Sequence, residues 1–219
     1  MKLSKETLTL IKNYASINSN LLLKPGKKLA TMAVGNKVFS SATIAEDFPV
    51  QFPIYDVNEL LSVLSLFNDP DIDFSEKYLT IQEGKASLKY FAAAIEGLIV
   101  PPDREANLGD AIITFDLDAA SLATVLRTAP ILKVQGISFV GDGSTVSLVV
   151  ADKKNATSNS YSTVVGTTNK AFKVNVAVEN IKMLPGDYEV SISQRGIKFK
   201  SKAADLTYYV AIELDSKFE

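Results

Sequence analysis

The sequence predicts an α+β protein built from two similar halves, in which helices pack on antiparallel sheets. Three observations carry this prediction. Short runs of alternating apolar and polar residues, which are typical of strands, fill much of the 219-residue chain. Stretches with helical spacing of apolar residues interrupt these runs in both halves. The order of elements in the first half returns after residue 111, which indicates a duplicated domain of about 110 residues.

The first element is expected to be an amphipathic helix that begins after Ser4, a residue type that caps helix N-termini well. Leu8, Ile11 and Ala15 follow at helical spacing and are expected on its buried face. The opposite face carries polar residues at spacings of four, three and four: Lys5, Thr9, Lys12 and Ser16.

Strands and one more helix complete the first half. Turn residues at 25–26 and 35–36 separate the runs LLL, KLATMAV and KVFSSATI. A strand at 52–54 leads into the helix DVNELLSVLSLF, for which Asp56 and Glu59 form a capping-box pattern. Three further strands are centred on pairs of apolar residues: Ile72 and Phe74, Leu79 and Ile81, Leu88 and Tyr90.

Residues 96–111, EGLIVPPDREANLGDA, interrupt the pattern of strands and helices. A proline pair, glycines and mixed charge predict a connecting segment outside the sheets. The sequence therefore predicts an N-terminal domain at 1–95, a connector at 96–111 and a C-terminal domain at 112–219.

The second half repeats the order of elements. The strand IITFDL precedes a helix capped by Asp118 and ended by Pro130. A hairpin follows across Gly141-Asp142-Gly143, and then a variable stretch at 152–169. A strand at 172–178 leads into a fourth helix, ENIKML, before the strands YEVSIS, GIKFKS and LTYYVAIEL. The buried face of the third helix is expected to carry Leu122, Val125, Leu126 and Ala129.

Composition excludes most kinds of catalytic and metal site. The chain has no cysteine and no histidine, so thiolate chemistry, serine triads and the usual zinc sites are excluded. Asp69, Asp71 and Asp73 are spaced like the start of a calcium loop, but Phe74 and Thr80 stand where glycine and glutamate are required. Gly141 and Gly143 lack the Lys-Ser/Thr ending of a phosphate loop, so no catalytic residue, metal or cofactor is expected.

No segment resembles a signal peptide, and no apolar run is long enough to cross a membrane. The formal net charge of −2 means that contact with nucleic acid would depend on local groups of Lys and Arg. Such groups occur on the predicted helices, as Lys5 and Lys12 on the first, Arg127 on the third and Lys182 on the fourth.

These cations lack interleaved aromatic residues, so they can contact phosphates but cannot read bases. They predict a sequence-independent, salt-sensitive attraction to DNA, although the same lysines also fit an ordinary solvated helix face. The second helix offers neutral side chains at the corresponding positions: Asn58, Ser62 and Ser65.

Four segments, MKLSKETLTLIKNYASINS, IYDVNELLSVLSLFND, MLPGDYEV and YYVAIELDS, resemble the sliding clamps of T-even-type bacteriophages. They occur in the same order and reach from the first residue nearly to the last, whereas 100–112 and 152–170 show no such resemblance. The resemblance implies a DNA clamp fold, in which three two-domain copies close head to tail into a pseudo-sixfold ring lined by helices. A related fold closes with two larger subunits, and the chain length of two repeats favours three copies.

A clamp of this kind is expected to encircle double-stranded DNA and to tether a DNA polymerase, which confers processivity. The resemblance then implies phosphate contacts in the bore from Lys5, Lys12, Arg127 and Lys182, with Lys2 and Lys133 as lesser candidates. It also implies docking of the polymerase, the clamp loader and late transcription factors in the cytoplasm of an infected bacterium.

Partner peptides of the family dock in an apolar pocket near the connector, where Leu98, Ile99 and Val100 are the candidates. A strand or linker pinned to the core fits the same run better, because a Leu-Ile-Val run stands before Pro101 and Pro102. The rival interpretation of the whole chain is a β-rich phage structural protein of the capsid or tail, which gives no reason for basic helices.

Overall fold

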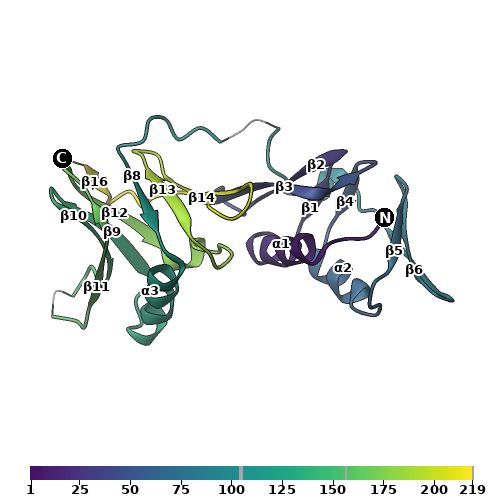
Figure 1. The fold of residues 1–219 in the computed structure, drawn as a ribbon, viewed down its shortest axis with the longest axis horizontal. Coiled ribbons are helices and arrows are strands. Elements are labelled where there is room, and N and C mark those ends of the chain that lie inside the picture. The colour runs from purple at the N-terminus through teal and green to yellow at the C-terminus, as the bar shows by residue number, and fades with distance from the viewer. Residues whose placement is uncertain (104–105, 156, 219) are drawn as a thin grey trace. The chain divides into compact units, whose positions relative to one another are not determined.

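The computed structural model, shown in Figure 1, describes most of the chain: residues 1–103, 106–155 and 157–218. The chain divides into two compact units, unit 1 at Met1–Arg104 and unit 2 at Glu105–Glu219. The boundary falls within the stretch 96–111, of which residues 104 and 105 lie outside the described part, as does residue 219 at the end of the expected C-terminal domain.

Unit 1 places two α-helices on one side of its first four strands (Figure 1). β1 pairs with β4, β2 with β3, and β5, β6 and β7 form a meander, all antiparallel. In chain order the elements are α1 (Lys5–Ile17), β1 (Leu21–Leu23), β2 (Gly26–Met32), β3 (Val38–Phe48), β4 (Phe52–Ile54), α2 (Val57–Leu64), β5 (Asp71–Phe74), β6 (Tyr78–Glu83), β7 (Ala86–Phe91) and the 3₁₀ helix η1 (Ile95–Gly97).

The buried face of α1 differs from the one predicted. Ile11 is buried, but Leu8 and Ala15 are half-buried. The face is rotated because Tyr14 packs in the core, where the Ser40 hydroxyl donates to its phenolic oxygen at 3.1 Å. The fully buried residues of α1 are Thr7, Leu10, Ile11, Tyr14 and Ile17.

The second helix begins as predicted and ends earlier. The Asp56 side chain accepts a hydrogen bond from the backbone N–H of Asn58 at 2.9 Å. The helix was expected to reach residue 67, but α2 stops at Leu64 because Leu66 and Phe67 form tighter i to i−3 bonds, at 3.2 Å each. The Tyr90 hydroxyl donates to the Glu59 carboxylate at 3.5 Å. This contact, and not the expected capping box, positions the Glu59 side chain.

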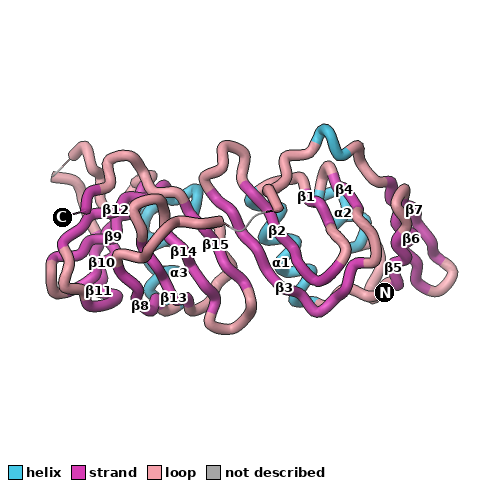
Figure 2. Tube along the Cα trace, turned by 90° about the horizontal axis from the view of Figure 1, so that it is seen from above, coloured by secondary structure: helices cyan, strands magenta, loops and turns pink. Residues whose placement is uncertain are grey.

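Unit 2 contains two antiparallel sheets and one α-helix within its described residues. One sheet has the order β11-β10-β9-β12-β16, and β8, β13, β14 and β15 pair in the order β8-β13-β14-β15 (Figure 2). The elements are β8 (Ile113–Leu117), α3 (Ala119–Ile131), β9 (Gly136–Asp142), β10 (Thr145–Val150), β11 (Tyr161–Thr167), β12 (Ala171–Ala177), the 3₁₀ helix η2 (Val178–Asn180), β13 (Tyr188–Ile192), β14 (Ile197–Ser201), β15 (Leu206–Val210) and β16 (Lys217–Phe218).

The strand pattern of unit 2 was predicted in part. The hairpin is confirmed, since Phe139 pairs with Leu148 and Ile137 with Val150. No element was assigned to the variable stretch 152–169, but β11 lies there and pairs with β10. Its serines, threonines and Gly166 hide the alternation, and a register shift interrupts its pairing.

The predicted fourth helix is also wrong, because η2 forms a single 3₁₀ turn and the chain then leaves the helical conformation. The backbone N–H of Leu184 donates to the Tyr208 hydroxyl at 3.3 Å, and the Leu184 carbonyl accepts from the Tyr188 hydroxyl. Pro185 disfavours a helical conformation at the residue before it. Too few residues remain between η2 and Leu184 for a stable helix.

Aromatic residues fill the centre of unit 2. The rings of Tyr188 and Phe199 pack edge to face at 6.3 Å. The Phe139 ring lies 6.3 Å from that of Phe199, and the Tyr208 ring lies 6.2 Å from that of Tyr188. Burial raises the pKa of Tyr208 to about 12, so its hydroxyl stays protonated at neutral pH. In both units α-helices pack on antiparallel sheets, which confirms the α+β prediction.

None of the helices in the described residues has the length and apolar character that a bilayer-crossing helix needs.

Candidate functional site

The exposed face of α1 carries two of the candidate cations. Lys5 and Lys12 are both exposed, and two helical turns separate them, so they lie about 10 Å apart along the axis. Within the described residues neither lysine forms an ion pair. The structure therefore brings these two charges together on one solvated face.

The start of α1 is fixed by a carboxylate from β3. Glu46 accepts hydrogen bonds from the backbone N–H of Ser4 and from the Thr7 hydroxyl. Partial burial raises the pKa of Glu46, but these hydrogen bonds outweigh burial and hold that pKa below its usual value. Glu46 is thus ionised at neutral pH and holds the lysine-bearing helix on the sheet.

Arg127 lies on the exposed side of α3, and its Nε donates to the carbonyl of Ala123 at 3.3 Å. Asp118 caps the helix by accepting from the N–H and hydroxyl of Ser121, which lowers the pKa of Asp118. The predicted buried face is confirmed except that Leu126 is half-buried, and α3 continues one residue beyond Pro130.

The other three candidate cations are less favourably placed. Lys182 is exposed but follows η2 in irregular chain, so it does not lie on a helix as predicted. Lys133 follows α3 with a positive φ of 56°. Lys2 forms an ion pair with Asp69, and this hydrogen bond raises the pKa of Lys2, so a nearby carboxylate offsets its charge.

The face of α2 is neutral, as its sequence indicates. The hydroxyl of Ser62 donates to the carbonyl of Asn58 at 2.7 Å, and that of Ser65 donates to the carbonyl of Ser62 at 2.6 Å. In the described residues no group of acidic side chains is arranged to hold a metal ion. Among the helices of the described residues, α1 therefore carries two of the exposed candidate cations and α2 carries none.

The run Leu98, Ile99 and Val100 crosses the surface of unit 1 as extended chain. The N–H of Ile99 donates to the side-chain oxygen of Asn20 at 3.0 Å, and the amide of Asn18 donates to the Ile99 carbonyl at 2.8 Å. Ile99 is exposed, whereas its two neighbours are half-buried. Val100 alone of the three lines a groove of about 220 Å³, together with Leu22, Lys24, Pro25, Lys28, Ala30, Phe39, Pro101, Pro102 and Asp103.

Unit 1 has an open strand edge at β7 that the sequence did not single out. The outer edge of β5 is covered because Ile72 exchanges two hydrogen bonds with Met1, each 2.7 Å long. β7 ends the meander on the other side, and within the described residues no strand of unit 1 pairs with its outer edge. Phe91 on this strand is 68% exposed.

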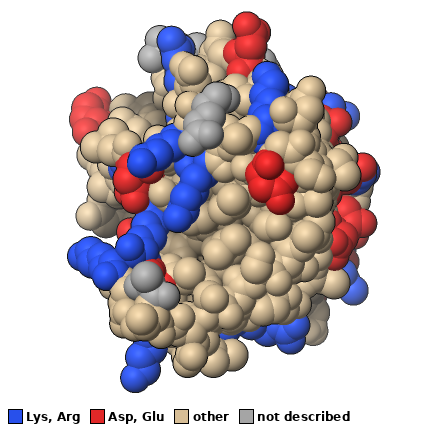
Figure 3. Space-filling model, turned by 90° about the vertical axis from the view of Figure 1, so that its left-hand side faces the viewer, with Lys and Arg blue, Asp and Glu red and all other residues tan. Residues whose placement is uncertain are grey.

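Unit 2 has a corresponding open edge at β11. The opposite edge of the same sheet ends with the two-residue strand β16. The sequence of β11, YSTVVGT, has no charged residue, and Val164 is 62% exposed. Figure 3 shows a broad area with few charged side chains on this face of the molecule. Open, uncharged strand edges mark surfaces that pair with another chain.

Comparisons with known proteins agree with this geometry. A family model described as DNA polymerase processivity factor matches residues 4–99. The sliding clamp of Escherichia phage RB69 is 32% identical over 231 residues, covering 99% of this chain and 98% of the relative. The sliding clamp of Vibrio phage KVP40 is 30% identical over 221 residues, covering 97% of this chain and 99% of the relative.

Among solved structures, PCNA from Thermococcus kodakaraensis is similar with a TM-score of 0.70 at 13% identity. The similarity covers 95% of this chain and 96% of that one. At this identity the likeness concerns the fold alone, and it confirms the predicted DNA clamp fold.

Proposed function

The chain belongs to the phage sliding clamps, the family of DNA polymerase processivity factors, and we propose that it encircles duplex DNA and tethers the replicative polymerase to its template. A tether keeps a dissociated polymerase at high effective concentration near its primer end. The function is topological and needs no catalytic residue.

The observation that carries this proposal is a pair of open strand edges that carry an exposed apolar residue, β7 with Phe91 in unit 1 and β11 with Val164 in unit 2. β7 and β11 are different surfaces, so contact between copies is head to tail, and such contacts close into a ring when the rotation allows. Pairing β7 of one copy with β11 of the next would satisfy both backbone edges and cover Phe91 and Val164.

Three copies are the proposed number. Each chain provides two compact units, and three chains supply six similar units for a pseudo-sixfold ring. The proposed domains are 1–95 and 112–219, joined by the connector 96–111.

Lys5 and Lys12 are the proposed main contacts to DNA phosphates, because they share one exposed helix face and lack ion pairs within the described residues. Arg127 is the candidate on α3, and Lys182 and Lys133 are weaker candidates in irregular chain. Lys2 ranks last, since Asp69 offsets its charge. Contacts to phosphates alone leave a ring free to slide.

The groove beside Val100 is the proposed docking place for peptides of the polymerase, the clamp loader and late transcription factors. Its largely apolar lining, and the connector residues 100–103 that form part of its wall, support this role. The backbone of Ile99 is held by hydrogen bonds with the side chains of Asn18 and Asn20, and Leu98 and Ile99 would form the border of the groove. These partners place the ring in the cytoplasm of the infected host.

The proposed assembly is tested by the solution mass from light scattering over a dilution series. The unaltered protein is expected to have the mass of three chains at high concentration, and Val164→Asp is expected to be monomeric because a buried unpaired carboxylate opposes edge pairing. Val34→Asp is the matched control, since Val34 is also exposed, at 69%, but lies in a turn of unit 1.

A monomer at every concentration for the unaltered chain would contradict the ring. Equal masses for the two variants would place the interface elsewhere than β11.

A further inference from the structure

The two units hold the segment that follows their last long strand in the same way. In unit 1 the N–H of Ala93 donates to the carbonyl of Pro53 in β4, at 3.0 Å. In unit 2 the N–H of Glu213 donates to the carbonyl of Asn175 in β12, at 2.8 Å. Ala93 therefore corresponds to Glu213, and Pro53 corresponds to Asn175.

Strand register extends this correspondence to the neighbouring residues. Pro53 pairs with Leu22, and Asn175 pairs with Ser138. Counting from these four residues relates three more positions of unit 1 to positions of unit 2: Asn18 to Val134, Asn20 to Gly136 and Tyr55 to Ala177.

In unit 1 the connector lies across these positions. Asn18 and Asn20 bind the backbone of Ile99 through the two side-chain hydrogen bonds already described. Asn20 also donates to the carbonyl of Tyr55 at 2.6 Å, so its side chain is held facing the connector. An extended segment of the chain itself thus fills this place in unit 1.

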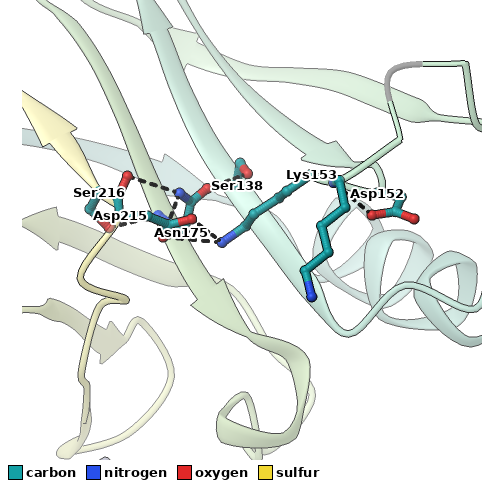
Figure 4. Close-up of polar contacts among 7 residues, drawn as sticks. Ser138, Asp152, Lys153, Asn175, Asp215 and Ser216 are labelled. Atoms are coloured by element: carbon teal, nitrogen blue, oxygen red, sulfur yellow. Dashed lines mark hydrogen bonds and ion pairs between the residues drawn. The ribbon is translucent and has the colours of Figure 1, made fainter.

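In unit 2 the chain turns away after Glu213 and forms β16 against β12. Figure 4 shows the hydrogen bonds that hold the segment after Glu213 in this path. The N–H of Asn175 donates to the Ser216 hydroxyl at 3.0 Å, and its side-chain amide donates to Asp215 at 2.9 Å. Lys153 holds the same carboxylate at 3.0 Å, and the bonds from Lys153 and Asn175 lower the pKa of Asp215.

Pro53 cannot hold the connector in this way, because proline has neither a backbone N–H nor an amide side chain. The corresponding strand position therefore holds a proline in unit 1 and an asparagine in unit 2, and this difference accounts for the different paths of the connector and of the segment after Glu213. In unit 2 the departing segment leaves a groove of about 640 Å³.

This groove, here called the Val134 groove, has a floor of small or apolar residues: Val134, Gly136, Ala151, Val176 and Ala177. Charges of both signs border it, and in the described residues four of them form no ion pair: Lys133, Lys154, Glu179 and Glu213. An apolar floor with a mixed-charge rim suits a protein segment better than a nucleic acid, which requires a basic surface.

We propose that the Val134 groove binds an extended segment of a partner protein, in the place that the connector occupies in unit 1. The small floor residues leave room for a bulky aliphatic side chain, and the rim pairs with charged residues that flank it. Val134 and Gly136 lack the amides of their counterparts, so apolar burial on the floor and charge pairing at the rim together supply the affinity. This site is separate from the groove beside Val100 and does not depend on ring closure.

The test measures fluorescence anisotropy of a labelled peptide, AIEGLIVPPD, which copies residues 94–103 of the connector. The full-length protein is expected to bind it saturably. Ala177→Trp fills the groove and is expected to weaken binding by about tenfold or more. Ala203→Trp places the same side chain on an exposed turn of unit 2 and is expected to leave binding unchanged.

A second variant tests the proposal in the opposite direction. Val134→Asn combined with Gly136→Asn restores the amide pair of unit 1, and a Cβ at Gly136 meets no atom closer than 3.4 Å. We expect this variant to bind the peptide about fivefold more tightly, because it gains two hydrogen bonds to the peptide backbone.

Two results would overturn the proposal. The first is no saturable binding to the unaltered protein or to the double-asparagine variant. The second is binding that Ala177→Trp leaves unchanged. If Asn20→Ala alters such binding, the peptide instead displaces the chain's own connector in unit 1.

Discussion

In the part of the chain that the structure describes, unit 1 packs two α-helices on its sheets and unit 2 packs one, although both follow the same order of elements. α2 continues for eight residues from its cap at Asp56. The corresponding stretch of unit 2 stops after η2, since two tyrosine hydroxyls bind the backbone of Leu184 just before Pro185. The alternation of apolar residues thus accounts for most strands of both units, whereas a few long-range hydrogen bonds determine whether a second α-helix forms.

The difference also divides the functional features between the units. Unit 1 carries Lys5 and Lys12 on one helix, whereas unit 2 offers Arg127 as the cation on its α-helix. Unit 1 presents the open edge of β7, and unit 2 presents that of β11. The two units are therefore alike in fold and unlike in the surfaces that they offer to DNA and to other copies.

The largest expected effect concerns the two edges. Phe91→Asp and Val164→Asp are each expected to be monomeric, since each loses one side of the head-to-tail interface. An equimolar mixture is expected to form dimers and no ring, because each variant keeps the edge that the other has lost. Sedimentation velocity measures these masses, and trimers in the mixture would contradict pairing of β7 with β11.

A smaller effect is expected for charge. Lys5→Glu combined with Lys12→Glu is expected to reduce processive primer extension by about tenfold, with the oligomer intact, because phosphate contacts are lost and repulsion is gained. Arg127→Glu is expected to reduce it by about threefold. Equal losses, or unchanged extension by the double variant, would remove the proposed dominance of α1.

The hydroxyl of Tyr208 accounts for part of the difference between α2 and η2. Tyr208→Phe leaves the half-buried N–H of Leu184 without its acceptor and is expected to lower the free energy of unfolding by about 1 kcal/mol. Urea titration measures this change. Tyr55→Phe, at an exposed tyrosine of unit 1, is the control and is expected to have no effect, so equal changes would contradict the assignment.

The smallest effect concerns pH and the start of α1. Glu46 has a lowered pKa in the folded state, so its stabilising contribution is fully present above its ordinary pKa of 4.5 and is lost as pH falls through the lowered value. Glu46→Gln is expected to lower the melting temperature by about 2 °C at neutral pH and by less in acid. A difference from the unaltered protein that grows as pH falls would contradict this sign.

Local patterns in the sequence predicted most of the fold. The alternation around Phe139 and Leu148 gave the hairpin, and Ser4 and Asp118 marked where helices begin. The missed features depend on partners distant in sequence. β11 lacks a clear apolar alternation, and the path after Glu213 is set by Asn175, whose bonds to Asp215 and Ser216 join residues about 40 positions apart.

The candidate site was predictable to the same extent. Lys5 and Lys12 were placed on one exposed face because helical spacing alone determines that they share it. Tertiary contacts determine that Lys182 lies outside a helix and that Lys2 pairs with Asp69, and residue spacing does not reveal such contacts. The open edges of β7 and β11 required the strand order of each sheet.

Retention on circular DNA tests the central claim most directly. The protein is loaded by its clamp loader onto a nicked plasmid, separated from free protein by gel filtration, and followed after a restriction enzyme cuts the plasmid. Topological encirclement predicts that the protein stays with circular DNA and is released when the DNA becomes linear. Equal retention on the circular and the cut plasmid would mean that binding does not depend on a closed ring around the duplex, which would contradict the account.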